Sequence, residues 1–166
     1  MNSEELRGLQ APLKERYRAE PDAALVTLRA SGRLGEGVSC SLEGARALVR
    51  AGLHPATGGT GEMACSGDML LEALVACAGV TLSAVATAIG VAVRDGTVRA
   101  EGDLDFRGTL GVSKEAPVGF RAIRLRFELD TDAPPEQVAK LIQLTERYCV
   151  VYQTLARPPV LEVSAA

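Results

Sequence analysis

The chain has 166 residues, of which 47% are hydrophobic and 23% charged, with 21 acidic residues against 18 basic ones. This length suits one domain with its own core rather than two ordinary domains, and the composition excludes a largely disordered chain. The net charge of -3 excludes the broad basic surface by which proteins bind nucleic acid.

The N-terminal segment predicts a helical appendage. Residues 3–19 carry charges spread in a helical pattern, with a break or kink expected at Pro12. We therefore expect residues 1–22 to be an appendage and residues 23–166 to form the main domain. The chain does not open with a basic stretch followed by an apolar one, as secretion signals do, so the expected location is the cytoplasm.

Short strands are expected next. Alternation of apolar and polar residues predicts strands at 23–32 and 38–42, joined by a Gly-containing turn, and a third strand at 44–50. Residues 52–67 hold five Gly and one Pro, which predicts a loop.

A long uncharged segment follows this loop. Residues 73–91 carry no charge, and such a length would span a bilayer. Small residues dominate the segment, however, and no cluster of Lys and Arg flanks it. We therefore expect no membrane span but a helix buried on all sides, from about Asp68 to Ile89. Ser66 or Asp68 is expected to cap its start, and Gly90 to end it.

The second half of the chain predicts two more strands, a helix and a last strand. Residues 97–107 and 120–131 alternate strongly, and Pro135 suits the first turn of a helix that runs to about Arg147. A final strand is expected at 159–164. Because tight strand–helix–strand repeats are few in this order, the predicted class is α+β.

Cys77 lies within the long apolar helix, where a free cysteine is usually a small core residue. The alternative is a nucleophile in an apolar pocket. Mid-helix placement puts Cys77 beyond the reach of the helix dipole, and apolar surroundings raise the pKa of a thiol. The nucleophile hypothesis therefore requires a cation from elsewhere in the fold, and arginine suits best because it stays charged when desolvated.

Three other cysteines have different surroundings. Cys149 is expected at the end of the last helix, where it is either a buried structural residue or a movable resolving thiol. Cys40 lies in a predicted strand, and Cys65 lies on the Gly-rich loop, where it is a candidate accessory thiol. No CxxC pair is present and His54 is the only histidine, so we expect no metal site; His54 is interpreted as a surface turn residue.

Three segments of the chain resemble one known family. Residues 66–82, SGDMLLEALVACAGVTL, resemble the central helix of the osmotically inducible protein C and organic hydroperoxide resistance (OsmC/Ohr) family. Residues 149–155, CVVYQTL, resemble the segment around that family's second cysteine, with Val150 in place of the usual Pro and Tyr152 in place of Ser. Residues 32–39, GRLGEGVS, resemble its hairpin. The resemblance covers residues 25–164.

The resemblance implies an OsmC-like fold, in which antiparallel sheets wrap around long buried helices in an intertwined homodimer with active sites at the subunit interface. It implies reduction of organic hydroperoxides without a metal or bound cofactor. Cys77 takes the place of the peroxidatic cysteine, Cys149 that of the resolving one, and Arg33 that of the arginine. Asp68 falls where the family has a glutamate that orients this arginine, and Glu72 is the alternative.

The expected activity is therefore that of a thiol-dependent peroxidase, in which Cys77 becomes a sulfenic acid, Cys149 forms a disulfide with it, and a dithiol reductant restores both. An apolar pocket would favour alkyl hydroperoxides over hydrogen peroxide. Two alternatives remain open: a non-catalytic module that binds an apolar ligand, and a thiol transferase that uses Cys65.

Overall fold

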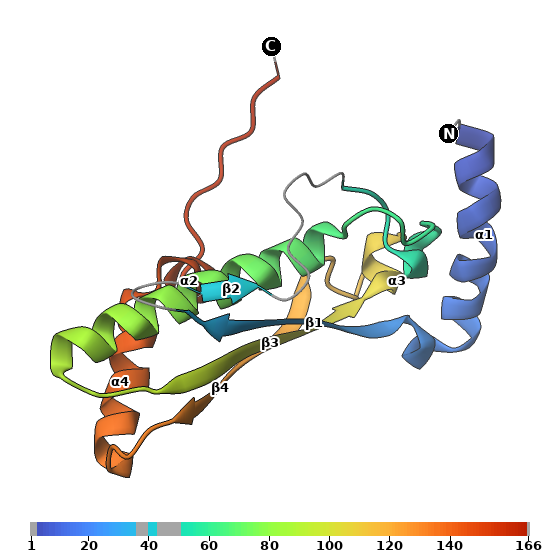
Figure 1. Cartoon of the computed structure of the whole chain (residues 1–166). Coiled ribbons are helices and arrows are strands. Elements are labelled where there is room, and N and C mark those ends of the chain that lie inside the picture. Colours follow the sequence, from blue (N-terminus) through green and yellow to red (C-terminus); the bar gives the residue numbers. More distant parts are fainter. Residues whose placement is uncertain (1–2, 36–39, 43–50, 166) are drawn as a thin grey trace. The chain divides into compact units, whose positions relative to one another are not determined.

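The computed structural model of the chain describes residues 3–35, 40–42 and 51–165 (Figure 1). One antiparallel sheet and several helices, one of them long, confirm the predicted α+β class. The third predicted strand, at 44–50, lies outside the described residues. The elements in chain order are α1 (Ser3–Ala19), η1 (Pro21–Ala24), β1 (Leu25–Leu34), β2 (Cys40–Leu42), η2 (Pro55–Thr57), α2 (Ser66–Ile89), β3 (Asp95–Asp105), α3 (Phe106–Thr109), β4 (Phe120–Asp130), α4 (Pro135–Tyr148) and α5 (Val150–Ala156).

The four strands form a sheet in the order β2-β1-β3-β4. The predicted hairpin is present, because β1 pairs antiparallel with β2 in a register that sets Gly32 opposite Leu42 and Leu34 opposite Cys40. On β3 the buried and accessible residues alternate, which is the period of two that the sequence showed.

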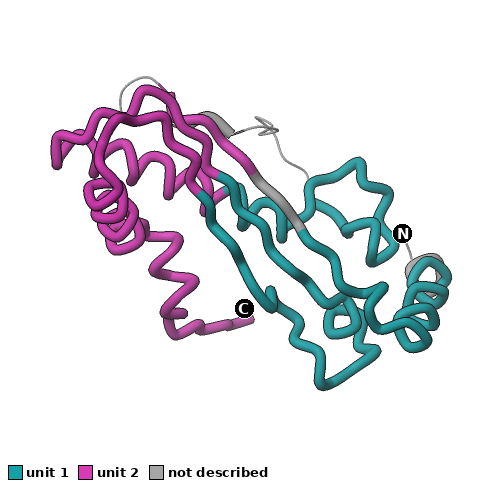
Figure 2. Tube along the Cα trace, turned by 90° about the horizontal axis from the view of Figure 1, so that it is seen from below, with its two compact units in different colours: residues 1–30, 44–72, 99–126 teal, residues 31–43, 73–98, 127–166 magenta. Residues whose placement is uncertain are grey.

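The chain divides into two compact units (Figure 2). Unit 1 comprises residues 1–30, 44–72 and 99–126, and unit 2 comprises residues 31–43, 73–98 and 127–166. The long elements α2, β1, β3 and β4 each contribute residues to both units, so the two are described separately below.

The core of unit 2 lies between the second part of α2 and α4. Leu82 and Leu141 are completely buried, and Ala86 and Val91 nearly so. Full burial of one such leucine stabilises the fold by about 1.5–3 kcal/mol. Partly buried apolar side chains from the strands and helices pack around this cluster, namely Leu34, Val85, Val93, Phe127, Leu129, Ala133 and Ile142.

Helix α2 is the long apolar helix that the sequence predicts. It begins at Ser66, two residues before the predicted start, and Gly90 ends it with a φ of +69°, in the left-handed region that favours glycine. Within the single chain, α2 is not buried on all sides, because Val80 is 39% and Ile89 41% exposed. Within the part of the chain that the structure describes, α2 alone is long and apolar enough to cross a membrane, but a core helix has the same length and composition.

Unit 1 is built around α1, the start of α2, and parts of β3 and β4. Tyr17 of α1 is 3% exposed, and Asp105 is 1% exposed and paired with Arg107 at 2.6 Å. On the sheet, the Arg124 guanidinium forms ion pairs with Glu101 at 3.3 Å and Asp103 at 2.5 Å. The buried Asp105 carboxylate is thus matched by a partner, as the cost of burying an ion requires.

One strand end, one predicted strand and one helix differ from the sequence predictions. The strand expected to reach residue 107 ends at Asp105, because the Asp105 carboxylate accepts a hydrogen bond from the Arg107 N–H at 3.1 Å and so begins α3. The strand predicted at 159–164 is wrong: this segment has no strand structure. Its apolar side chains are 82–96% exposed, so the local alternation has no neighbouring strand to pair with. Helix α5 was not expected.

Candidate functional site

Cys149 lies at the junction of two helices in unit 2. Its backbone is extended, with φ of -72° and ψ of 110°, so it ends α4 and begins α5. Its N–H donates to Thr145 O at 2.9 Å, and its sulfur accepts a hydrogen bond from the Tyr152 N–H at 3.5 Å. The Cys149 side chain is therefore held by both helices, and it is completely buried.

The sulfur of Cys77, on α2, meets this junction. The groups that act on the pKa of Cys77 as hydrogen-bond donors are the Cys149 thiol, the backbone N–H groups of Val150 and Val151, and the hydroxyl of Thr81. Cys77 is half-buried, and both cysteines are free thiols. The structure thus brings together the two cysteines that the sequence singled out.

The surroundings separate the acidities of the two thiols. Burial raises the pKa of Cys77, but the hydrogen bonds from Val151, Cys149, Thr81 and Val150 together outweigh it, so that the pKa lies below the ordinary value. Burial raises the pKa of Cys149 to about 11, and its hydrogen bond to Cys77 adds to the rise. Of the two thiols, Cys77 therefore ionises first and Cys149 keeps its proton.

The groups that lower the pKa of Cys77 are not the cation that the sequence predicts. Among the residues that the structure describes, the groups that lower the pKa of Cys77 are hydrogen-bond donors, mainly at the start of α5, and Arg33 is not one of them. Arg33 lies on β1 opposite Ser41, with an exposed side chain. Its role in the site remains a prediction.

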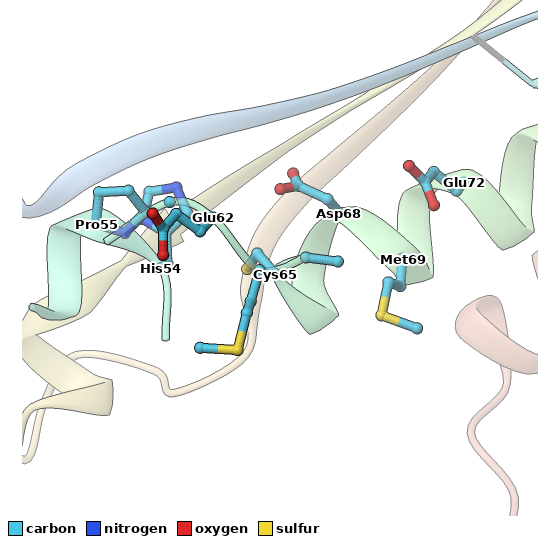
Figure 3. Close-up of a pocket in the computed structure, with 10 residues that line it drawn as sticks. His54, Pro55, Glu62, Cys65, Asp68, Met69 and Glu72 are labelled. Carbon is cyan, nitrogen blue, oxygen red and sulfur yellow. The ribbon is translucent and has the colours of Figure 1, made fainter. Parts of the chain in front are cut away.

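Asp68 belongs to unit 1, where it lines a cavity of about 300 Å³ beside the first turns of α2 (Figure 3). Glu72 lies one helical turn further on, and the two carboxylates point to the same side of the helix. Burial raises the pKa of Asp68, and the neighbouring His54 opposes the rise. Both candidates for the orienting carboxylate therefore stay open. The whole lining is His54, Pro55, Gly61, Glu62, Met63, Ala64, Cys65, Asp68, Met69 and Glu72.

His54 is more than a surface turn residue. Its Nδ1 accepts a hydrogen bond from the Ala56 N–H at 3.0 Å, which caps η2, and its ring stacks on Phe106 with centroids 5.1 Å apart.

Cys65 lies just before α2, where its carbonyl accepts from the Met69 N–H at 3.0 Å. In the described ranges, no three His, Cys, Asp or Glu side chains are grouped so as to hold a metal ion.

Comparison with known proteins gives a family and two similar folds. A family model described as OsmC-like protein matches residues 59–164, well over half of the chain. The crystal structure of an OsmC-like hydroperoxide resistance protein from Jannaschia sp. CCS1 is similar, with a TM-score of 0.58 and 20% sequence identity over 86% of this chain and 97% of that one. The crystal structure of an OsmC-like protein from Mycoplasma pneumoniae has a TM-score of 0.58 and 17% identity over 81% of this chain and 86% of that one. No curated protein matches this chain.

Proposed function

Because the chain belongs to the OsmC-like protein family, we propose that it is a cytoplasmic thiol-dependent peroxidase that reduces organic hydroperoxides, with Cys77 as the attacking thiol and Cys149 as the resolving one. The observation that carries the proposal is the contact between these two free thiols, of which one has a lowered and the other a raised pKa. Two thiols in contact and of unequal acidity suit a cycle in which one attacks and the other resolves.

In the first step, the Cys77 thiolate attacks the terminal oxygen of the hydroperoxide. An S–O bond forms and the O–O bond breaks, so that the sulfur is oxidised to a sulfenic acid and the alkoxide leaves. The thiol proton of Cys149 protonates the alkoxide, and the alcohol departs. The Val150 and Val151 N–H groups, which stabilise the thiolate before the attack, lower the cost of keeping it ionised in apolar surroundings.

In the second step, the Cys149 thiolate formed in this way attacks the Cys77 sulfur. The S–O bond breaks, hydroxide leaves and is protonated to water, and a disulfide forms. A dithiol reductant then returns both sulfurs to thiols and is itself oxidised to a disulfide. Because Cys149 both ends α4 and begins α5, it reaches Cys77 without rearranging the interior of either helix.

Arg33 and a carboxylate complete the proposal, on the strength of the family resemblance. Arg33 binds the peroxide oxygen and the thiolate, and Asp68 or Glu72 orients its guanidinium. In a homodimer, the Arg33 guanidinium and the carboxylate that act on one Cys77 could come from either subunit. The apolar side chains Val80 and Ile89, exposed on different sides of α2, support burial of this helix by a second copy, because large exposed apolar residues favour association.

Steady-state turnover tests the proposal. With a dithiol as reductant, the protein should consume tert-butyl hydroperoxide faster than hydrogen peroxide, and Cys77→Ser should abolish the activity. Cys65→Ser is the matched control, since it removes a thiol from unit 1, and it should retain full activity. Equal activity of Cys77→Ser and the unchanged protein would overturn the proposal, and loss of activity in Cys65→Ser would favour the thiol transferase instead.

A groove in unit 2 supports the second candidate function, the binding of an apolar ligand. This groove has a volume of about 600 Å³ and its lining is mainly apolar, with Phe127 and Leu129 on β4 facing Val138 and Ile142 on α4. A fluorescent fatty acid should bind there if this function is correct, and Ile142→Glu should weaken the binding. Thiols that stay unmodified after peroxide treatment, together with such binding, would decide for the second candidate.

A further inference from the structure

Helix α1 holds the turn η2 through two hydrogen bonds and one close packing contact, all within unit 1. The Tyr17 hydroxyl donates to Ala56 O at 2.7 Å, and Gln10 Nε2 donates to Thr57 O at 3.3 Å. Gly58 follows with a φ of +93°, and a Cβ at this position would lie 3.1 Å from the Leu9 Cβ. The turn and the helix therefore fit closely, and the turn's carbonyls rely on α1 for these two donors.

The same turn fixes His54. The backbone of Ala56 is held on both sides, because its carbonyl accepts from Tyr17 and its N–H donates to His54 Nδ1 at 3.0 Å. The Thr57 hydroxyl donates to the His54 carbonyl at 2.9 Å. Ala56 thus links α1 to His54 through its own backbone.

His54 lines two cavities, and Cys65 lines the same two. One is the cavity beside Asp68 and Glu72. The other, of about 390 Å³, is mainly apolar and includes Leu70, Leu104 and Phe106 in its walls. A movement of the His54 turn would therefore widen both cavities next to the Cys65 thiol.

Helix α1 buries few of its described side chains. Over residues 8–19, the part of α1 whose side chains the structure describes, Tyr17 alone is buried. Pro12 interrupts the hydrogen bonds within the helix. A helix that buries so little apolar surface is released at a small fraction of the free energy needed to unfold the unit around it.

We propose that α1 is a releasable latch on the turn formed by residues 54–58. When α1 is docked, the turn holds His54 against Phe106 and the Cys65 thiol stays half-buried. When α1 is released, by displacement or by cleavage of the helix, the turn moves, the two cavities beside Cys65 widen, and the thiol becomes more exposed. This device does not depend on the proposed peroxidase function, because it involves neither Cys77 nor Cys149.

Alkylation of individual cysteines with iodoacetamide, followed by mass spectrometry of the peptides, tests the latch. Tyr17→Phe removes only the hydroxyl and should raise the alkylation rate of Cys65 roughly fivefold, the factor expected for one net hydrogen bond. Tyr17→Ala removes the whole buried anchor and should raise the rate further. Tyr148→Phe, at a tyrosine that is 58% exposed on α4, is the matched control and should leave the rate unchanged.

The completely buried Cys149 reports on general unfolding in the same experiment. Its alkylation rate should stay constant while that of Cys65 rises. Equal alkylation rates of Cys65 in the unchanged protein and both Tyr17 variants would overturn the latch. A parallel rise in the alkylation rate of Cys149 would also overturn it, because α1 would then unfold only together with the rest of the protein. Gln10→Ala, which removes the weaker hydrogen bond, should give a smaller rise at Cys65 and checks the result in a milder variant.

Discussion

Replacing Cys149 with alanine should raise the pKa of Cys77, since the Cys149 thiol is one of the four donors to the Cys77 sulfur. A hydrogen bond to a charged group contributes about 1.5–3 kcal/mol. Water reaches the half-buried sulfur and replaces part of the lost bond, so the low end applies. At 1.36 kcal/mol per unit, the expected rise is about one pKa unit. Cys149→Ser, which keeps a hydroxyl donor in the same place, should shift the pKa less.

The pH dependence of alkylation at Cys77 measures this effect, because only the thiolate reacts. The thiolate fraction grows with pH, so a rise of one unit in the pKa lowers the rate about tenfold at any pH well below the midpoint. In the unchanged protein the midpoint for Cys77 should lie below 9.0, the ordinary value, and that for Cys149 near 11. Cys65→Ala should leave the Cys77 midpoint where it is. An unchanged midpoint in Cys149→Ala would refute the hydrogen bond and the division of roles between the two thiols.

Three stability changes follow from the packing and the backbone, and urea unfolding measures each. Leu141→Ala should cost about 2–5 kcal/mol, because this side chain is completely buried in the core of unit 2; a loss below 1 kcal/mol would contradict that core. Gly90→Ala should cost about 1–2 kcal/mol, because Gly90 has a positive φ, whereas Gly119→Ala, where a Cβ also meets open space, should cost little. Asp105→Asn should cost about 2–3 kcal/mol by leaving Arg107 without its carboxylate. Arg107 lowers the pKa of Asp105, so this stabilisation is present above the ordinary carboxylate range and is lost as the pH falls through the pKa of Asp105 in the folded protein. The unchanged protein and the Asp105→Asn variant should therefore become equally stable in strong acid.

Local signals in the sequence were enough for most of the fold. The uncharged run before Gly90 predicted α2, and the alternation in residues 97–107 and 120–131 predicted β3 and β4, each within two residues of its observed end. These features depend on side-chain periodicity and on glycine, which a short window of sequence contains. The segment 159–164 has the same alternation but no strand, because a strand also needs a neighbour, which local sequence does not specify.

The pairing of two cysteines was predictable from the sequence, but the groups that set their pKa values were not. The family resemblance pointed to Cys77 and Cys149 together, and the structure sets them in contact. The source of the low pKa was missed, because the N–H donors of Val150 and Val151 belong to α5, a helix that its β-branched residues disfavour. A backbone N–H donor cannot be recognised from residue types, whereas a cation such as Arg33 can, so only a cation could be predicted from the sequence.

Treatment of the reduced protein with one equivalent of tert-butyl hydroperoxide, followed by peptide mass spectrometry, is the most direct test of the central claim. The account predicts a loss of two hydrogens, with a disulfide that joins the peptides of Cys77 and Cys149, and a stable sulfenic acid at Cys77 in the Cys149→Ser variant. Unmodified thiols at both positions, or oxidation confined to Cys65, would contradict it.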